Sequence, residues 1–309
     1  MPTPIIIDCD PGHDDVFAIW LAAGNPDIDL LAVTTVSGNG YLEHTTRNAR
    51  VACTVAGVTG VPVAAGAERP LMRQAAPATW IHGDNALGGP DLPEPTVPLD
   101  PRTAVQLISD IVREAPVPVT LVPTGPLTNI ATFVLAEPAL AAKVREIVWM
   151  GGSTGRGNVG AYPEFNAWSD PEAADIVVRS GIPFTMVGLN ITHQALVTDE
   201  VIEGVRAIGN RTALFGAELL RFFSASYQAV EGIPGPLHDP VAVAIVIDRT
   251  VATSVHARLD IETKGTETAG ATCVDLHNML RREPNAQIAM ELDVERFWSL
   301  VKDSVRALA

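Results

Sequence analysis

Short apolar runs alternate with amphipathic stretches through the first two thirds of this 309-residue chain. The runs are dense in Ile, Val and Leu on both faces, which is typical of buried parallel strands. They are Pro4–Cys9, Leu30–Val36, Val61–Ala65, Val117–Val122, Glu146–Met150 and Pro183–Leu189. The stretches between them have helical spacing of apolar positions: Val16–Ala23, Glu43–Ala56, Thr103–Glu114, Leu127–Leu135 and Glu172–Arg179. This alternation predicts a doubly wound, mostly parallel α/β sheet with flanking helices and with ligands at the carboxyl ends of its strands.

The rest of the chain follows other patterns. Gln74–Pro98 is rich in Pro and Gly and predicts a long loop, a feature that is often functional. Thr198–Val230 has a helical pattern, and another helix should open near His238-Asp239-Pro240, since proline is tolerated in a first turn. Three later runs predict a small antiparallel extension before a final helix: His256–Glu262, Thr272–Leu276 and Gln287–Leu292. We see no internal repeat or interdomain linker and expect one domain over residues 1–309.

Composition narrows the class of protein. A hydrophobic content of 47% supports a large core, and a net charge of -15 argues against a nucleic-acid partner. The amino terminus has no basic segment or small-residue cleavage site of a signal peptide, and no apolar run is long enough to span a bilayer. Cys9, Cys53 and Cys273 fit neither a disulfide framework nor a zinc site. We therefore expect a soluble cytoplasmic protein without a membrane partner.

Four aspartates lie within the eight residues Asp8–Asp15, directly after the first predicted strand. Pleating places Asp8 and Asp10 on the same side of that strand, and Pro11-Gly12 turns the chain toward a helix that begins near Asp14 and Asp15. Helix capping can use one aspartate, but so many carboxylates repel one another unless a cation compensates them. A hard divalent ion, Ca²⁺ or Mg²⁺, is the expected ligand.

The segment Asp-x-Asp-Pro-Gly-x-Asp-Asp resembles the signature of the inosine–uridine-preferring nucleoside hydrolase family. The resemblance covers essentially the whole chain, in an ordered set of further motifs: Ser37-Gly38-Asn39, His82-Gly83, Thr124-Gly125-Pro126-Leu127-Thr128-Asn129, Met150-Gly151-Gly152, Glu164-Phe165-Asn166 and His238-Asp239. It implies hydrolysis of the N-glycosidic bond of ribonucleosides, with either a pyrimidine preference or no preference. It also implies one Ca²⁺ per subunit and a homodimer or homotetramer.

The resemblance assigns a role to each candidate residue of the metal site. Asp10, Asp15, Asp239 and the carbonyl oxygen of Thr124 would hold the calcium ion, and Asp10 would also act as general base. Asp14 would bind a ribose hydroxyl. Without the resemblance, Thr124-Gly125-Pro126 could be an ordinary strand-to-helix turn, and both readings can hold together.

The substrate-binding candidates come from several segments. Glu164 and Asn166 would bind the ribose hydroxyls, with Asn158 nearby and Met150 lining the sugar pocket. Buried hydroxyls need such hydrogen-bonding partners. Asn39 resembles a substrate ligand but could be a turn residue.

Three further candidates concern the leaving base and the loop. His238 resembles the proton donor to the departing base, a role that suits the pKa of an imidazole. His82 either contacts the substrate or belongs to a solvated loop. Tyr227 matches a position that touches the base, although ordinary core packing would also explain it. Two other functions stay open at this point: a noncatalytic nucleoside-binding protein on the same fold, and a Mg²⁺-dependent haloacid-dehalogenase-like phosphatase.

Overall fold

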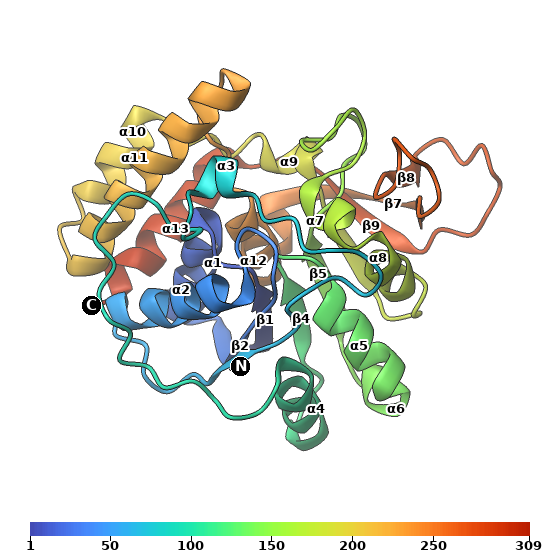
Figure 1. The fold of residues 1–309 in the computed structure, drawn as a ribbon, viewed down its shortest axis with the longest axis horizontal. Helices are drawn as coiled ribbons and strands as arrows, with labels where there is room; N and C mark the ends of the chain where they lie inside the picture. Colours follow the sequence, from blue (N-terminus) through green and yellow to red (C-terminus); the bar gives the residue numbers. More distant parts are fainter.

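One mixed sheet forms the centre of the computed structural model, which describes residues 1–309. Its strands lie in the order β3-β2-β1-β4-β5-β6-β9-β7-β8 (Figure 1). They are β1 (Thr3–Cys9), β2 (Ile28–Thr35), β3 (Val63–Ala65), β4 (Thr120–Pro123), β5 (Glu146–Met150), β6 (Phe184–Val187), β7 (Ala252–Ile261), β8 (Thr272–Asp275) and β9 (Ala286–Leu292). Every pairing from β3 to β9 is parallel, whereas β7 is antiparallel to both of its neighbours. The predicted doubly wound sheet with an antiparallel extension is confirmed.

Helices cover both faces of this sheet. One face carries α1 (His13–Gly24), α2 (Leu42–Val55), α12 (Asp239–Ile247) and α13 (Val294–Ala307), and the other carries α4 (Ala104–Glu114), α5 (Thr128–Ala136) and α8 (Pro171–Val178) (Figure 1). Ile5 and Ile7 of β1 belong to the core on the first face, and Ile6 belongs to the core on the second. This alternation follows from the pleat of a strand that is buried on both sides.

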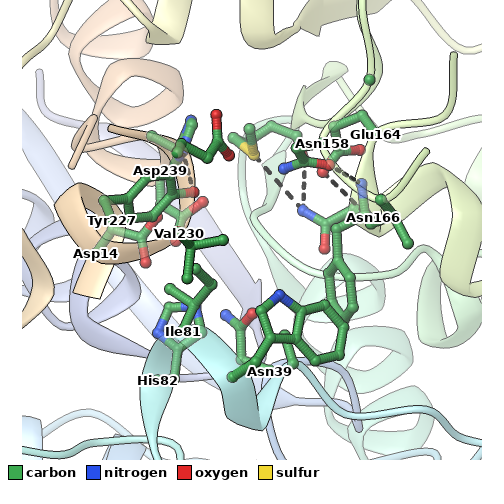
Figure 2. Close-up of a pocket in the computed structure, with 18 of the residues that line it drawn as sticks. Asp14, Asn39, Ile81, His82, Asn158, Glu164, Asn166, Tyr227, Val230 and Asp239 are labelled. Atoms are coloured by element: carbon green, nitrogen blue, oxygen red, sulfur yellow. Dashed lines mark hydrogen bonds between the residues drawn. The ribbon is translucent and has the colours of Figure 1, made fainter. Parts of the chain in front are cut away.

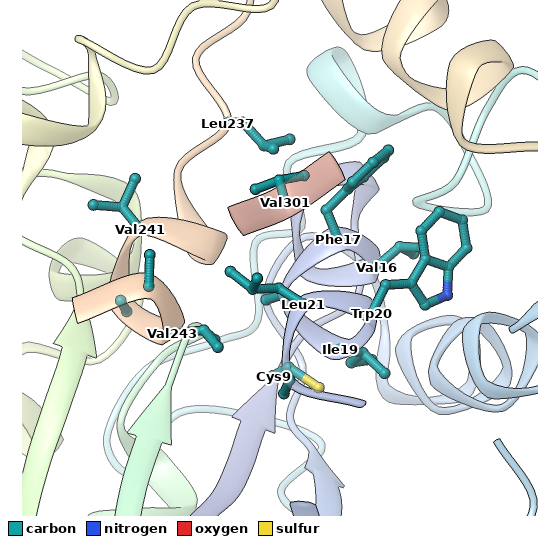
Figure 3. Close-up of a cluster of buried hydrophobic side chains, with 14 of the residues drawn as sticks. Cys9, Val16, Phe17, Ile19, Trp20, Leu21, Leu237, Val241, Val243 and Val301 are labelled. Atoms are coloured by element: carbon teal, nitrogen blue, oxygen red, sulfur yellow. The ribbon is translucent and has the colours of Figure 1, made fainter. Parts of the chain in front are cut away.

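Helix α1 is buried along nearly its whole length, from His13 to Ala22. Phe17, Trp20 and Leu21 pack in the core beside Val241 of α12 and Val301 of α13 (Figure 3). Burying each large side chain contributes about 1.5–3 kcal/mol. The helix that carries Asp14 and Asp15 is therefore held rigidly against its neighbours.

The switch in winding direction lies between β1 and β4. From β1 the chain proceeds outward to β2 and β3, and from β4 it proceeds in the opposite direction to β5 and β6. The carboxyl ends of β1 and β4 are adjacent, since Asp8 pairs with Pro123. In open α/β sheets, ligands bind in the crevice at such a point. The acidic segment and Thr124 follow these two strand ends directly.

Several element boundaries differ from the prediction. The long helical stretch is two helices, α10 (Asp199–Arg206) and α11 (Arg211–Glu231), because Gly209 turns the chain at a φ of +82° and Asn210 caps α11. The predicted loop Gln74–Pro98 contains the short helix α3 (Thr79–His82). Strand β9 runs parallel to β6, so only β7 runs against the rest of the sheet. None of the helices combines the length and apolar character needed to cross a bilayer.

Candidate active site

A cavity of about 420 Å³ opens at the carboxyl ends of the central strands. That volume is in the range of small-molecule sites. Figure 2 shows Asn158, Glu164 and Asn166 on one side of the cavity and Asp14, Tyr227 and Asp239 on the other. Of the predicted site residues, those that line it are Asp14, Asn39, His82, Thr124, Met150, Asn158, Glu164, Asn166, Tyr227, His238 and Asp239. Asp10 and Asp15 are buried and do not line it.

Three carboxylates come together beside this cavity. Oxygens of Asp14, Asp15 and Asp239 lie within 4.8 Å of one another. Asp14 and Asp15 are brought there by the first turn of α1, and Asp239 by the first turn of α12, which packs against α1. The structure thus groups Asp14 with two of the predicted metal ligands, and Asp10 is not in this group. The division of roles between Asp10 and Asp14 stays a prediction.

Asp10 is fixed by its surroundings. Its Oδ2 accepts a hydrogen bond from the backbone N–H of Asn39 at 2.6 Å, while its Oδ1 is buried without a partner. A Cβ on Gly38 would lie 2.0 Å from Oδ2, and a Cβ on Gly125 would lie 2.6 Å from Oδ1. Glycine at both positions therefore makes room for the carboxylate of Asp10, which explains why two neighbouring turns carry it.

The electrostatics of the cluster favour a cation. Burial, followed by repulsion from Asp15, raises the pKa of Asp14 to about 8. Burial and neighbouring carboxylates also raise the pKa of Asp10 and of Asp239 well above the ordinary range. Oδ1 of both Asp10 and Asp14 is buried without a hydrogen-bonding partner. Such a set of buried oxygens fits a hard divalent ion.

Thr124 connects the carboxylates to the opposite wall of the cavity. Its hydroxyl donates to Oδ1 of Asp15 at 2.9 Å, and its carbonyl oxygen accepts from Nδ2 of Asn166 at 2.8 Å. Nδ2 of Asn166 also donates to the carbonyl oxygen of Met150 at 3.0 Å. With Nδ2 used in this way, the Oδ1 of Asn166 is the atom left for a ligand.

Glu164 organises the wall that faces the carboxylates. It caps α7 (Phe165–Ser169) and accepts from the backbone N–H groups of Gly152, Asn166 and Ala167 at 2.7, 2.8 and 3.1 Å. Burial raises the pKa of Glu164 to about 7, and these hydrogen bonds oppose the rise. Asn158 lies nearby, with its Oδ1 accepting from the backbone N–H of Phe165 at 2.9 Å, which leaves Nδ2 for a ligand.

His238 is held on both ring nitrogens. Its Nδ1 lies 2.7 Å from the hydroxyl oxygen of Thr192, and its Nε2 lies 2.9 Å from that of Tyr227. Burial lowers the pKa of His238 well below the ordinary value. Tyr227 is thus both a core residue and part of the cavity wall. Thr192 was missed in the sequence, where its position shortly after the strand β6 was the available signal.

His82 belongs to the cavity rather than to solvent. It is buried, and its Nδ1 lies 3.1 Å from Nδ1 of His13. The side chain of Asn39 also contacts the site, since its Nδ2 donates to Oδ2 of Asp15 at 3.3 Å. Ala86 in the same loop as His82 has a φ of +59°, in the left-handed region that favours glycine.

Comparison with known proteins decides the family. The model of the family described as inosine-uridine preferring nucleoside hydrolase matches residues 5–299. The chain belongs to this family. It is a ribonucleoside hydrolase, an enzyme that cleaves the N-glycosidic bond. The family assignment also decides against the two alternative functions considered from the sequence, a phosphatase and a noncatalytic binding protein.

Individual relatives cover the hydrolase from end to end. The inosine-uridine preferring nucleoside hydrolase of Leishmania major is 47% identical and aligns over 100% of this chain and 99% of its own. The pyrimidine-specific ribonucleoside hydrolase RihA of Escherichia coli (strain K12) is 43% identical, with 100% of both chains covered. The solved structure of a purine-preferring ribonucleoside hydrolase from Gardnerella vaginalis superposes with a TM-score of 0.91 at 33% identity, covering 98% of each chain.

An ion pair lies at the edge of the hydrolase's cavity. Arg156 and Glu231, which both line it, are joined at 3.0 Å, and the same guanidinium lies 3.3 Å from Nδ1 of His193. Arg156 is exposed, so the pair is worth little to stability. The pair links the loop after β5 to the end of α11.

Proposed function

We propose that this hydrolase uses one calcium ion to release free base and ribose from ribonucleosides, and that it prefers pyrimidine nucleosides or acts without preference. One observation carries the proposal: a cavity with buried carboxylates on one side, amide side chains that keep a free polar atom on the other, and a hydrogen-bonded histidine beside them. The names of its relatives span inosine-uridine, pyrimidine and purine substrates. Pyrimidine-specific relatives align over the full chain, which supports the first option.

Asp10, Asp15, Asp239 and the Thr124 carbonyl would hold the calcium ion. The buried, partnerless Oδ1 of Asp10 and the close oxygens of Asp15 and Asp239 support this set. When bound, such an ion lowers the pKa of a water molecule and orients it. Calcium accommodates six to eight oxygen ligands, so substrate hydroxyls fit beside the protein oxygens.

Asp10 would accept the proton of the attacking water. The hydrogen bond from Asn39 holds Oδ2 at 2.6 Å and leaves Oδ1 as the free oxygen.

The ribose would be bound by side chains that keep a hydrogen-bonding atom free of partners within the protein. Oδ1 of Asn166 can accept from a hydroxyl, and Nδ2 of Asn158 can donate to an oxygen, because their other amide atoms are used within the protein. Three of the lone pairs of Glu164 accept backbone N–H groups, which leaves one for a hydroxyl. Asp14 and Asn39 would contact the ribose from the opposite side, and Met150 would line the pocket.

His238 would deliver a proton to the departing base. Because burial keeps its ring neutral in the empty cavity, His238 would take up a proton from solvent as negative charge develops on the base and would then pass it to the base, returning to the neutral form. The hydroxyl groups of Tyr227 at Nε2 and Thr192 at Nδ1 would hold the ring in place for this transfer. General acid catalysis of this kind contributes roughly 10²–10⁴-fold to the rate.

Release of ribose and free base from a panel of purine and pyrimidine ribonucleosides tests the proposal. We expect turnover of uridine and cytidine that a calcium chelator abolishes and that calcium restores. Restoration by Mg²⁺ but not by Ca²⁺ would contradict the choice of ion. Turnover confined to purine nucleosides would contradict the choice of substrate.

We further propose that the chain is one domain, because a single sheet runs through it from β1 to β9. The proposed cytoplasmic location is supported by three cysteines that form no disulfide, two of them buried.

A homodimer or homotetramer is proposed from the family resemblance. Light scattering coupled to size-exclusion chromatography would measure the assembly.

A further inference from the structure

His13 is the residue of the acidic segment that the proposed mechanism does not use. It is the first residue of α1 and is fully buried. Its ring stacks on those of Phe222 and His82, with centroids 5.2 and 5.3 Å away. Its Nε2 lies 2.8 Å from the carbonyl oxygen of Gly88, and its Nδ1 lies 3.1 Å from Nδ1 of His82. His13 therefore contacts both ends of the loop segment between residues 82 and 88.

These contacts fix where the protons of both histidines are. A carbonyl oxygen only accepts, so Nε2 of His13 must carry a hydrogen. A charged imidazolium would be buried between aromatic rings without an anionic partner, so the ring of His13 is neutral and its Nδ1 is an acceptor. The short contact with His82 then requires the proton on Nδ1 of His82. The backbone N–H of His13 also approaches this Nδ1, but at 3.5 Å that interaction is the weaker one.

The proton on Nδ1 of His82 also determines the role of its other ring nitrogen, Nε2. In a neutral imidazole with the proton on Nδ1, Nε2 is an acceptor. The hydrogen bonds of the His82 side chain within the protein use Nδ1 alone, and the side chain lines the cavity, so Nε2 is the ring atom left for a ligand. His82 therefore presents an acceptor to whatever occupies the cavity.

Close packing holds this loop in one position against α1 and α11. A Cβ on Gly12 would lie 2.5 Å from Nδ1 of His82, and a Cβ on Gly88 would lie 2.4 Å from the ring of Phe222. Both positions need glycine, because a larger residue would push the loop away from α1 and α11. The contact between the two histidine rings depends on this approach.

We propose that His13 is a positioning residue that fixes the tautomer and the place of His82, so that Nε2 of His82 accepts a hydrogen bond from a substrate hydroxyl. The proposal rests on the proposed function, in which a nucleoside occupies the cavity. His13 itself does not touch the substrate.

The tautomer can be read directly in the wild-type enzyme. Nitrogen-15 NMR of protein labelled at its seven histidines separates protonated from bare ring nitrogens, and the His82→Asn spectrum assigns the signals of His82. We expect a protonated Nδ1 and a bare Nε2. A protonated Nε2 on His82 would overturn the proposal. This spectrum can be recorded without any enzymatic activity. If the enzyme released no base from any nucleoside, the proposed function would be refuted, but the tautomer of His82 would still be measured.

A matched pair of variants tests the effect on catalysis. His13→Phe keeps an aromatic ring in the stack and removes both nitrogens, whereas Phe222→Leu weakens the stack and keeps them. We expect His13→Phe to lose the protonated Nδ1 signal of His82 and to lower kcat/KM for uridine roughly 3- to 10-fold, the effect of one hydrogen bond. Phe222→Leu should keep the signal.

The double variant separates positioning from a general loss of packing. If His13 acts through His82, His13→Phe combined with His82→Asn should be no slower than His82→Asn alone. Fully additive losses, or an unchanged kcat/KM in His13→Phe, would contradict the proposal. Circular dichroism checks that each variant is folded. If His13→Phe does not fold, the nitrogen-15 NMR spectrum of the wild-type enzyme still decides the tautomer of His82.

Discussion

Calcium binding to the carboxylate cluster should become tighter as the pH rises, because the empty cluster holds protons that the ion must displace. The pKa of Asp14 is raised to about 8, and those of Asp10, Asp15 and Asp239 are raised as well. Removing a proton below its pKa costs about 1.4 kcal/mol per pH unit. The apparent Kd for calcium should therefore fall at least about tenfold per unit between pH 6 and 8, the range below the raised pKa of Asp14.

The same shifts set the stability of the metal-free enzyme. A carboxyl group whose pKa is higher in the folded state than in the unfolded state makes the folded state bind more protons. Stability is then lost as the pH rises from the ordinary carboxyl range to the raised pKa, which is about 7 for Asp8 and Glu164 and about 8 for Asp14. The melting temperature of the chelated enzyme should fall over this window.

Calcium should reverse that loss. At a concentration of about 100 times Kd, an ion that binds only the folded state stabilises it by about 2.7 kcal/mol. For a chain of this size, that corresponds to a rise of roughly 5 °C in Tm.

Calorimetry with calcium and with chelator at pH 6, 7, 8 and 9 measures this rise in Tm, and titration calorimetry measures the Kd for calcium. Asp14→Asn is the control, with a shallower dependence of Kd on pH. A Kd that does not change between pH 6 and 8 would show that calcium displaces no proton from the cluster.

Three further predictions concern single side chains. Asp10→Asn should abolish hydrolysis of every nucleoside while circular dichroism stays unchanged, and substantial remaining turnover would contradict its role as base. His238→Ala should slow inosine and uridine roughly 10²–10⁴-fold but p-nitrophenyl riboside far less, since that leaving group needs no proton; equal losses in rate would count against proton donation. Thr103→Ala removes the cap of α4, where the hydroxyl accepts from the backbone N–H of Gln106, at a residue that does not line the cavity. It should lower the unfolding free energy by about 1 kcal/mol with kcat/KM unchanged, and a loss of activity would contradict this separation.

The sequence was sufficient for features that depend on local pattern. Buried strands such as β1 and β5 appear as short runs of Ile, Val and Leu, and the acidic segment follows β1 directly. Since parallel strands end at the same edge of a sheet, the contact of Asp15 with Thr124 could be expected once both segments were placed at strand ends.

Contacts between distant segments could not be read in this way. Thr192 and His238 are 46 residues apart, and His13 and His82 are 69 apart. Whether they meet depends on the paths of loops, which have no periodicity. The same holds for β9, whose apolar pattern is the same whether its neighbour is parallel or antiparallel, so its pairing with β6 had no local signal.

The grouping of Asp14 with Asp15 and Asp239 has a different cause. Sequence motifs place Asp14 and Asp15 side by side in a helical turn, but only the packing of α12 on α1 shows that both face Asp239. Glu164 likewise proved to have three backbone partners that the sequence did not indicate.

Calcium dependence of nucleoside hydrolysis is measured most directly by the release of ribose from uridine, cytidine and inosine by enzyme stripped of metal and then supplied with Ca²⁺. We expect no release from the stripped enzyme, recovery with Ca²⁺, and no recovery in Asp10→Asn. Full activity in the stripped enzyme, or none with Ca²⁺ on any of these nucleosides, would contradict this expectation.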